Sequence, residues 1–401
     1  MRLARILASL ALVVGVWTAQ AFAAENRDGP YVEYYENGQV RYTATFRDGQ
    51  LVGAWTEYWD NGQVKLTGQA EGSTFPNSVT SPRKAGTWTE YNRNGTPYLV
   101  VTYVNNTLHG PAVQYDRLGR LWREAAYENG ELAGRWTEYY ENGQVRQTGE
   151  VYGGWTIDRP LKTGAWVAYN RYGVLVFQGE YRSDRLHGRA VWYHLNGLPR
   201  YEANFSDGRL TGTWTEYYDN GQVRATGEAY GSAHGADSPE EPLRTGPWVE
   251  YHRSGVVAFE GTYVENKLQG RAVRYDANGL VRIEAEFDNG VLSGTWTEYY
   301  ETGTVRETGE ARGSELGVNA YLRPKRYGLW LRYGRDGALV EAGIYEDNWL
   351  TSTVPVESVP EELRRAGANT AGAATSGAKP ASGSSAADVV RPDAAGSEAA
   401  G

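Results

Sequence analysis

Aromatic and glycine residues recur at fixed positions along the chain, with polar residues alternating between them. Numbered from the first glycine of each repeat, the sixth position is Tyr and the tenth is Gly in all twelve repeats. Alternating runs on both sides of a turn predict two strands, so each repeat is predicted to form a β-hairpin. The basic repeat has 24 residues, and the twelve repeats begin at Gly29, Gly53, Gly86, Gly110, Gly134, Gly164, Gly188, Gly212, Gly246, Gly270, Gly294 and Gly328.

The tenth-position glycine marks the predicted turn of each hairpin. Asn precedes this glycine in seven repeats, for example at Asn37, Asn142 and Asn278. Asn-Gly between alternating runs favours a type I′ turn, because that turn needs positive φ at both central residues. A two-residue loop at positions nine and ten would pair position eight with eleven, six with thirteen and three with sixteen.

This register agrees with which residues occur together within a repeat. Position three is Trp in eight repeats, and position sixteen is Gly in seven of those, as in Trp55 and Gly68. Where position three is Ala, position sixteen is also Ala, as in Ala112 and Ala125. We interpret the pairing as a large ring lying over a bare cross-strand glycine. The same register puts positions three, five, seven, twelve and fourteen on one face. It puts four, six, thirteen and fifteen on the other, where Tyr at six would contact Arg at thirteen.

A single hairpin has no core, so neighbouring hairpins must pair edge to edge. Residues 29–352 are therefore predicted to form an all-β, elongated, solenoid-like meander of about twelve hairpins. The 50 glycines argue against long helices, because Gly lowers helix stability. Tyr outnumbers Phe by 30 to 7, which suits rings that keep one edge in water.

The two ends of the chain differ from the repeats. Residues 1–23 have the features of a signal peptide: two arginines, a short apolar run over 6–17 and the cleavage motif Ala21-Phe22-Ala23. The apolar run is too short to span a bilayer. Export to a bacterial periplasm or to the exterior is therefore predicted. Residues 353–401 are rich in Ala, Gly and Ser, which predicts a disordered tail.

Composition excludes several classes of function. The 40 basic and 49 acidic residues give a net charge of −9, which disfavours nucleic acid and strong binding to an acidic membrane. The absence of Cys excludes disulfides, thiolate metal sites and cysteine nucleophiles. No phosphate-binding loop, serine elbow or cluster of metal ligands is present in the sequence. We therefore predict no cofactor and no enzymatic activity.

Carboxylates recur at position five of the repeat. Two readings are open: a catalytic pair for glycoside chemistry, or a solvated face paired with Arg or Lys. A catalytic pair would be unique, whereas these carboxylates repeat, so the solvated face is favoured. The carboxylates that we keep as candidate binding residues are Glu57, Glu138, Glu216 and Glu298.

Every third repeat carries an insertion after its second strand, so all insertions should leave the sheet from one edge. Loops on one face of a repeat array often form its binding surface. The alternative is that the insertions have no function and are tolerated, because lengthening a loop costs little entropy. The insertions lie near residues 72–84, 152–163, 231–245 and 313–327. The candidate binding residues within them are Trp155, Asp237, Glu240 and Glu241.

Two sequence segments resemble a known family. They are Phe46-Arg-Asp-Gly49-Gln-Leu51-Val-Gly53-Ala-Trp55-Thr-Glu-Tyr58 and Asn106-Thr-Leu108-His109-Gly110. Both resemble MORN repeats, and more closely the MORN-variant repeats of the YwqK-type antitoxin family. The resemblance implies a solenoid of β-hairpins with a non-enzymatic binding role. Members of that family neutralise a partner toxin, and MORN proteins more broadly act as scaffolds and in some cases bind phospholipids.

Three hypotheses for function follow. The first is an exported, non-catalytic scaffold that binds a protein partner through its sheet face and edge loops, with a toxin-neutralising immunity protein as a special form. The second is a cell-wall or glycan binder, because rings beside carboxylates can stack on sugars. The third is an enzyme that uses the position-five glutamates.

Overall fold

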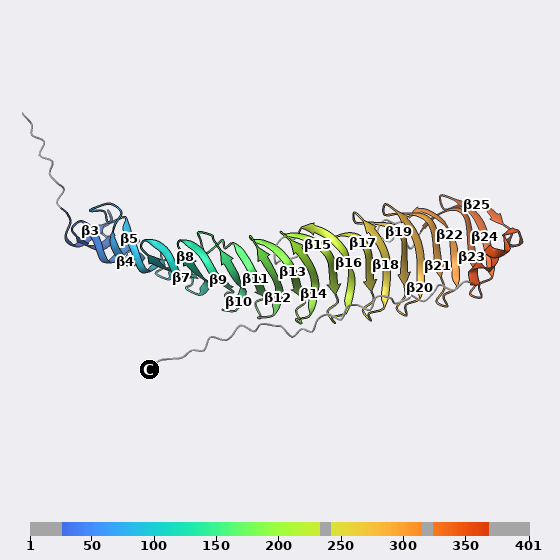
Figure 1. Ribbon diagram of the computed structural model, residues 1–401, viewed down its shortest axis with the longest axis horizontal. Coiled ribbons are helices and arrows are strands. Elements are labelled where there is room, and N and C mark those ends of the chain that lie inside the picture. Colours follow the sequence, from blue (N-terminus) through green and yellow to red (C-terminus); the bar gives the residue numbers. More distant parts are fainter. Residues whose placement is uncertain (1–25, 233–241, 315–323, 369–401) are drawn as a thin grey trace, which may run out of the picture. The chain divides into compact units, whose positions relative to one another are not determined.

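The computed structural model describes residues 26–232, 242–314 and 324–368. The predicted signal peptide, residues 1–23, and residues 369–401 of the predicted tail lie outside these ranges. The described chain consists of β-strands and three short C-terminal helices (Figure 1). It divides into two compact units at residue 161, and each is an antiparallel meander in which every strand pairs with the next. The predicted all-β hairpin fold is confirmed.

Unit 1 contains ten strands that follow one another in chain order (Figure 1). They are β1 (Gly29–Tyr34), β2 (Val40–Arg47), β3 (Gln50–Tyr58), β4 (Val64–Ser73), β5 (Pro82–Tyr91), β6 (Pro97–Val104), β7 (Thr107–Tyr115), β8 (Leu121–Glu128), β9 (Glu131–Tyr139) and β10 (Val145–Tyr152).

Unit 2 continues the same pattern and ends in a short helical segment. Its strands are β11 (Lys162–Tyr169), β12 (Leu175–Arg182), β13 (Arg185–Tyr193), β14 (Pro199–Ser206), β15 (Arg209–Tyr217), β16 (Val223–Ser232), β17 (Leu243–Tyr251), β18 (Val257–Val264), β19 (Lys267–Tyr275), β20 (Val281–Asp288), β21 (Val291–Tyr299), β22 (Val305–Ser314), β23 (Pro324–Tyr333), β24 (Leu339–Glu346) and β25 (Trp349–Val354). The helices are η2 (Val356–Ser358), α1 (Glu361–Arg365) and η3 (Ala366–Ala368).

The predicted register holds along most of each hairpin. Trp55 pairs with Gly68, and Ala112 pairs with Ala125. In the one repeat with Trp at position three but no Gly at position sixteen, Trp88 pairs with Val101, which is also what the register requires. The correlation between positions three and sixteen in the sequence therefore reports a true cross-strand pair.

The predicted turn type is wrong. In the repeat that begins at Gly212, the Gly221 N–H donates to the Tyr218 carbonyl at 2.9 Å, and the Tyr218 N–H donates to the Gln222 carbonyl at 2.8 Å. Gly221 has a positive φ of 83°, whereas Asn220 is not among the residues with positive φ. This geometry is a type I turn closed by a glycine bulge, which needs only one left-handed residue.

Type I′ turns occur instead at the opposite edge of the sheet. Asp48 and Gly49 join β2 to β3 with φ values of 50° and 74°, as a type I′ turn requires. The equivalent pairs include Asn129-Gly130 in unit 1 and Asn289-Gly290 in unit 2. We call this edge the insertion edge, because the insertions replace these turns, and the edge of the Asn-Gly turns the Asn edge. The prediction that the insertions share one edge is confirmed within each unit.

The glycine bulge also changes which residues share a face. Tyr217 at position six pairs with Val223, so position twelve joins the tyrosines on what we call the Tyr face. Arg224 at position thirteen lies instead on the opposite face, which carries the position-three tryptophans and which we call the Trp face. There its Nη1 lies 2.6 Å from Glu216 Oε1. The predicted contact between Tyr at six and Arg at thirteen is therefore wrong. The cation at thirteen lies instead near the ring at position seven, as in Lys65, 5.0 Å from the centre of the Trp59 ring.

At Gly68, Gly227 and Gly309, the ring that covers the bare glycine comes from a different hairpin than predicted. A Cβ atom at Gly68 would lie 2.3 Å from the Trp88 ring, which belongs to the following repeat. The same holds for Gly309, which Trp330 covers at 2.4 Å. The glycine is needed for close approach, as predicted, but the contact joins neighbouring hairpins.

The end of the repeat domain lies beyond the predicted boundary at residue 353. Strand β25 continues to Val354, and η2, α1 and η3 then fold onto the Tyr face of β22 to β24. The Tyr333 hydroxyl donates to the Leu363 carbonyl at 2.7 Å, and Val359 is buried beside Tyr333. The predicted disordered tail therefore begins too early. The apolar residues of 355–368 find a partner in the exposed Tyr face at the end of the sheet.

Candidate functional site

The tryptophans at position three are structural. Trp88, Trp248 and Trp330 are buried. Their indole N–H groups donate to backbone carbonyls, for example Trp248 to Glu228 at 2.8 Å and Trp330 to Glu310 at 3.0 Å. A ring that is buried on its face and satisfied at its nitrogen has no free surface for a ligand.

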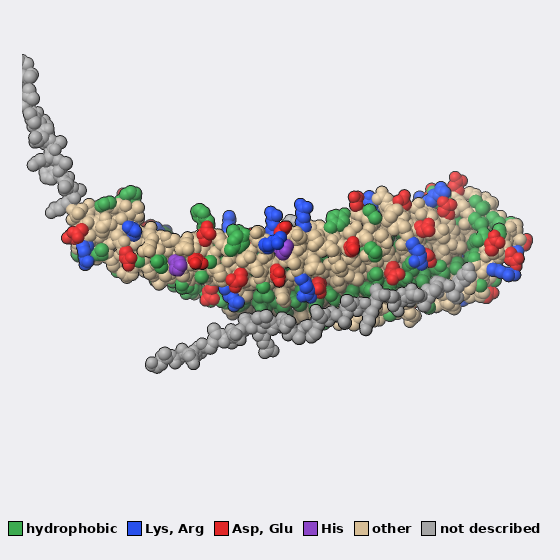
Figure 2. All heavy atoms as spheres, viewed as in Figure 1, with side chains coloured by type: hydrophobic (Ala, Val, Ile, Leu, Met, Phe, Trp, Pro, Cys, Tyr) green, Lys and Arg blue, Asp and Glu red, His purple; other side chains and the backbone are tan. Residues whose placement is uncertain are grey.

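The four candidate glutamates at position five are paired with cations, as the solvated-face reading predicted, although Glu138 is buried. Each of the four candidates has its partner at position thirteen of the same hairpin. The pairs are Glu57 with Lys65 at 2.8 Å, Glu138 with Arg146 at 3.6 Å, Glu216 with Arg224 at 2.6 Å and Glu298 with Arg306 at 2.9 Å. Figure 2 shows acidic and basic side chains interspersed over the visible surface. In the part of the chain that the structure describes, no group of three or more His, Asp or Glu side chains could hold a metal ion.

Glu138 is the most buried of these carboxylates and joins the sheet to an insertion. It accepts hydrogen bonds from Arg123 Nη2 at 3.1 Å and from Gln147 Nε2 at 2.9 Å. The same Arg123 forms an ion pair with Asp158, which lies in the second insertion. Glu138 therefore stabilises the cation that holds this insertion in place.

The second insertion presents a large ring to solvent. Trp155 is 82% exposed, whereas Ile157, two residues later, is only 3% exposed. The Ile157 carbonyl accepts the indole N–H of Trp136 at 2.9 Å. Together with the ion pair of Asp158 and Arg123, this contact fixes the loop on the Trp face and leaves Trp155 outside.

The first insertion has the same design. Phe75 is 66% exposed and Val79 is 4% exposed. The Val79 carbonyl accepts the indole N–H of Trp55 at 2.7 Å. Candidate residues Asp237, Glu240 and Glu241 of the third insertion lie outside the described residues.

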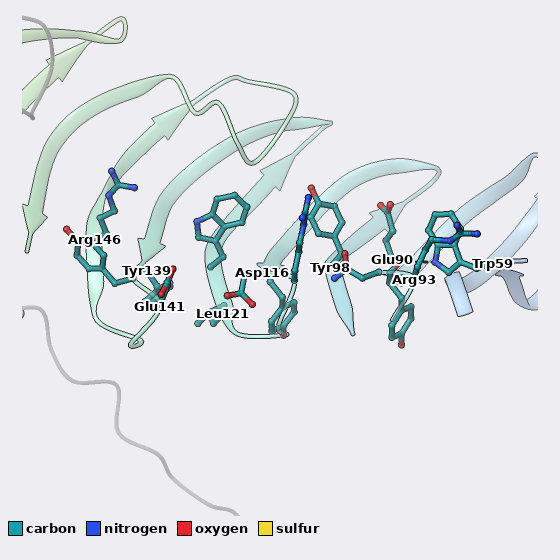
Figure 3. Close-up of a pocket in the computed structure, with 15 residues that line it drawn as sticks. Trp59, Glu90, Arg93, Tyr98, Asp116, Leu121, Tyr139, Glu141 and Arg146 are labelled. Atoms are coloured by element: carbon teal, nitrogen blue, oxygen red, sulfur yellow. Dashed lines mark hydrogen bonds between the residues drawn. The ribbon is translucent and has the colours of Figure 1, made fainter. Parts of the chain in front are cut away.

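A groove that sequence reasoning missed lies on the Trp face of unit 1, along the Asn edge (Figure 3). It has a volume of about 830 Å³ and runs across four consecutive hairpins, from Trp59 to Arg146. Rings from positions seven and thirteen line it, among them Trp59, Tyr98 and Trp122. The bulge turns position thirteen to this face, so the groove could not be derived from the predicted register.

Comparison with known proteins identifies the repeat. The MORN repeat variant family matches residues 27–48, 51–69, 132–151, 210–228, 244–265 and 292–310. These six segments are similar to MORN-variant repeats. Proteins with MORN repeats are generally linked to the binding of proteins or membranes, and the repeat is of a non-enzymatic kind. No curated protein matches the chain.

Solved structures offer only remote similarity. The crystal structure of TcdB2-TccC3 is 12% identical with a TM-score of 0.16, and the match covers 80% of this chain and 21% of that chain. The structure of a Photorhabdus luminescens Tc holotoxin pore is 13% identical with a TM-score of 0.15, covering 85% of this chain and 20% of that one. The chain thus spans about a fifth of the length of these structures. Within the described ranges, none of the helices is long and apolar enough to cross a membrane.

One regularity of the MORN-variant units escaped the sequence analysis. The residue two positions before the first glycine is Leu in seven units, such as the buried Leu51. It is Lys or Arg in the other five units. In those five, the cation stacks on the rings that follow: Lys84 Nζ lies 4.8 Å from the Trp88 ring centre and 4.9 Å from that of Tyr103. Burial lowers the pKa of the Lys84 ammonium. The five cations are Arg27, Lys84, Lys162, Arg244 and Arg326. The alternation of Leu with Lys or Arg at this position was the available signal.

Proposed function

We propose that this chain is an exported, non-catalytic repeat scaffold that binds a protein partner through the anchored insertions of unit 1. The observation that carries the proposal is Trp155, a ring 82% exposed on a loop that Ile157 and Asp158 hold to the sheet. Exposed tryptophans on fixed backbone are typical anchors of protein interfaces, because little entropy is lost when they become buried. The general link of MORN repeats to protein binding supports the same function.

The finer form of this proposal is an immunity protein that neutralises a toxin in the periplasm or outside the cell. Its support is the sequence resemblance to YwqK-type antitoxins and the signal-like residues 1–23. Export implies that the toxin would be met after translocation. Co-expression with an exported toxin, with cell survival as the readout, tests this form separately from partner binding.

The alternative of a glycan binder loses its main support. That hypothesis depended on the Trp stripe at position three, and those rings are buried against neighbouring hairpins. The catalytic reading loses support for a comparable reason, because the repeated glutamates form ion pairs within their own hairpins. The exposed rings of the insertions remain, and they suit a protein surface.

The test is a cross-linking pull-down from periplasmic extract with the chain that begins at Ala24. Trp155→Ala is expected to lower capture of the partner by about tenfold or more, which corresponds to ~1.4 kcal/mol. Trp349→Ala is the matched control, because Trp349 is 79% exposed on β25 in unit 2 and belongs to no insertion. Capture that is unchanged by Trp155→Ala, or lowered equally by both variants, would contradict the proposal.

A further inference from the structure

We propose that the groove of unit 1 binds a basic side chain of a protein, with arginine preferred and with the Glu90 carboxylate as its counter-charge. The site lies at the Asn edge, whereas Trp155 lies at the insertion edge, so it is a second contact surface of the scaffold. The inference rests on the proposed function only in taking a protein as the occupant.

Glu90 differs from the other position-five glutamates in having no cation. Position thirteen of its hairpin is Tyr98, where the paired repeats have Lys or Arg. Among the described residues, the Glu90 side chain forms no hydrogen bond and no direct ion pair, although its charge acts on the Lys84 ammonium. Glu250 also lacks a cation at position thirteen, but Arg244 supplies one at 3.0 Å. The carboxylate of Glu90 is therefore half-buried and has no direct ion-pair partner.

The cations near Glu90 form their direct contacts with other groups, although the Lys84 ammonium also interacts electrostatically with Glu90. Lys84 lies over the rings of Trp88 and Tyr103. Arg93 forms an ion pair with Asp60. At the far end of the groove, Arg146 pairs with Glu138, and Arg117 is exposed without an ion pair in the described structure. Lys84 acts on Glu90 only through space, so a cation bound in the groove would form the direct ion pair that Glu90 lacks.

The walls of the groove suit a cation. In Figure 3 the Glu90 side chain projects between the labelled side chains of Tyr98 and Trp59, which line the same groove. The Trp59 ring already has Lys65 at 5.0 Å and Arg93 at 5.3 Å from its centre, and the Trp122 ring has Arg123 at 3.7 Å. These rings accept cations on their faces but are already occupied by the protein's own, whereas the Tyr98 ring has no cation over it among the described contacts.

Arginine fits better than lysine for two reasons. Its planar guanidinium can stack on a ring while it donates two parallel hydrogen bonds to one carboxylate. It is also more weakly hydrated than an ammonium, so entering a half-buried groove costs less. The net charge of −9 further favours a basic partner by raising its association rate.

The experiment titrates the chain beginning at Ala24 with the peptide tri-arginine, followed by calorimetry, with tri-lysine and tri-glutamate as comparison peptides. Tri-arginine is expected to bind more tightly than tri-lysine, and tri-glutamate is expected not to bind. Glu90→Gln should weaken tri-arginine binding at least tenfold. Glu216→Gln changes the net charge by the same amount but removes a carboxylate already paired with Arg224, so it should leave binding unchanged.

Three outcomes would overturn the inference: no binding of tri-arginine to the unaltered chain, binding of tri-lysine as tight as that of tri-arginine, or equal effects of Glu90→Gln and Glu216→Gln. Circular dichroism of Glu90→Gln verifies that the fold is kept. The pull-down distinguishes this site from the proposed function. If Trp155→Ala abolishes capture and the peptide titration fails, the scaffold function stands and the groove site does not.

Discussion

At the scale of single residues, Asn at position nine illustrates how one residue type fits two turn geometries. Its role here is not positive φ but two side-chain hydrogen bonds. Asn220 Oδ1 accepts the Gln222 N–H at 3.1 Å, and its Nδ2 donates to the Arg253 carbonyl in the next turn at 3.1 Å. Asn61 repeats both contacts with Gln63 and Arg93. The Asn side chain therefore closes its own turn and ties it to the neighbouring one.

Glycine at position sixteen leads to the first prediction at this scale. Gly309→Ala would place a Cβ atom 2.4 Å from the Trp330 ring, and the buried ring has no room to move. We expect a loss of about 1–3 kcal/mol in the free energy of unfolding, as overpacking of a core produces. The measurement is the midpoint of urea unfolding.

Gly334→Ala is the control for this change. The Cβ atom at Gly334 would meet the exposed Asp336 carboxylate at 2.7 Å, which can move away at the cost of one hydrogen bond from the Ala338 N–H. A loss for Gly334→Ala equal to that for Gly309→Ala would show that the effect comes from glycine as such and not from the covering ring.

At the scale of the elements, hairpins are joined on the Tyr face by hydrogen bonds from Tyr at position six to Glu at position fifteen of the preceding hairpin. Tyr217 donates to Glu202 at 3.2 Å, and Tyr299 donates to Glu284 at 3.3 Å. Burial, reinforced by the neighbouring carboxylate, raises the pKa of Tyr217 from 10.0 to about 12, and the pKa of Tyr299 rises equally.

These shifted pKa values predict a loss of stability at high pH. A tyrosine whose pKa is raised by folding stabilises the protein fully below pH 10, and this contribution is lost as the pH rises from 10 toward 12. The midpoint of thermal unfolding should therefore fall across this window. In a pH titration, the absorbance of these tyrosinates should appear at a higher pH than that of an exposed tyrosine. Glu202→Gln should lower the pKa of Tyr217 but leave it above 10, because burial is the larger cause. Titration of all tyrosines near 10 would contradict this account.

The elements also show how much could be predicted from sequence. Position three and position sixteen change together, so Trp55 opposite Gly68 could be predicted without a structure. The bulge beside Tyr217 could not, because Asn-Gly suits both a type I′ turn and a type I turn with a glycine bulge. That single shift moved position thirteen to the Trp face and hid the groove at Glu90. The anchoring of Trp155 was also hidden, because nothing in a 12-residue insertion marks Ile157 as the buried residue.

At the scale of the whole molecule, the C-terminal helices act as a cap. They cover Leu331 and Tyr333 on the Tyr face of the last hairpin, which has no following repeat to pack against. Repeat arrays need such caps because a terminal repeat would otherwise expose its apolar surface.

Two truncations test the cap. A chain ending at Val354 should lose amide protection over β23 to β25 in hydrogen exchange, while unit 1 keeps its protection, because stability in a repeat array passes mainly between neighbours. A chain ending at Ala368 retains η2, α1 and η3 and should exchange like the full chain. Equal protection of β23 to β25 in both truncated chains would show that the helices contribute nothing to stability.

The two edges of the sheet differ in whether they carry insertions: the Asn edge has none among the described turns, and the insertion edge has several. Along the Asn edge, side chains at positions seven and nine bind the next turn, as Tyr218 does with Tyr251 and Asn220 with Arg253, so an added segment would break contacts on both sides. Along the insertion edge, the two-residue type I′ turns also bind a neighbouring turn, as the Gly290 N–H does with the Leu268 carbonyl at 2.8 Å, but the insertions show that a loop can replace such a turn. Added sequences can therefore accumulate along this edge, provided that each one replaces the lost contact with its neighbour, as the second insertion does where the Gly154 carbonyl accepts the Leu132 N–H at 2.9 Å.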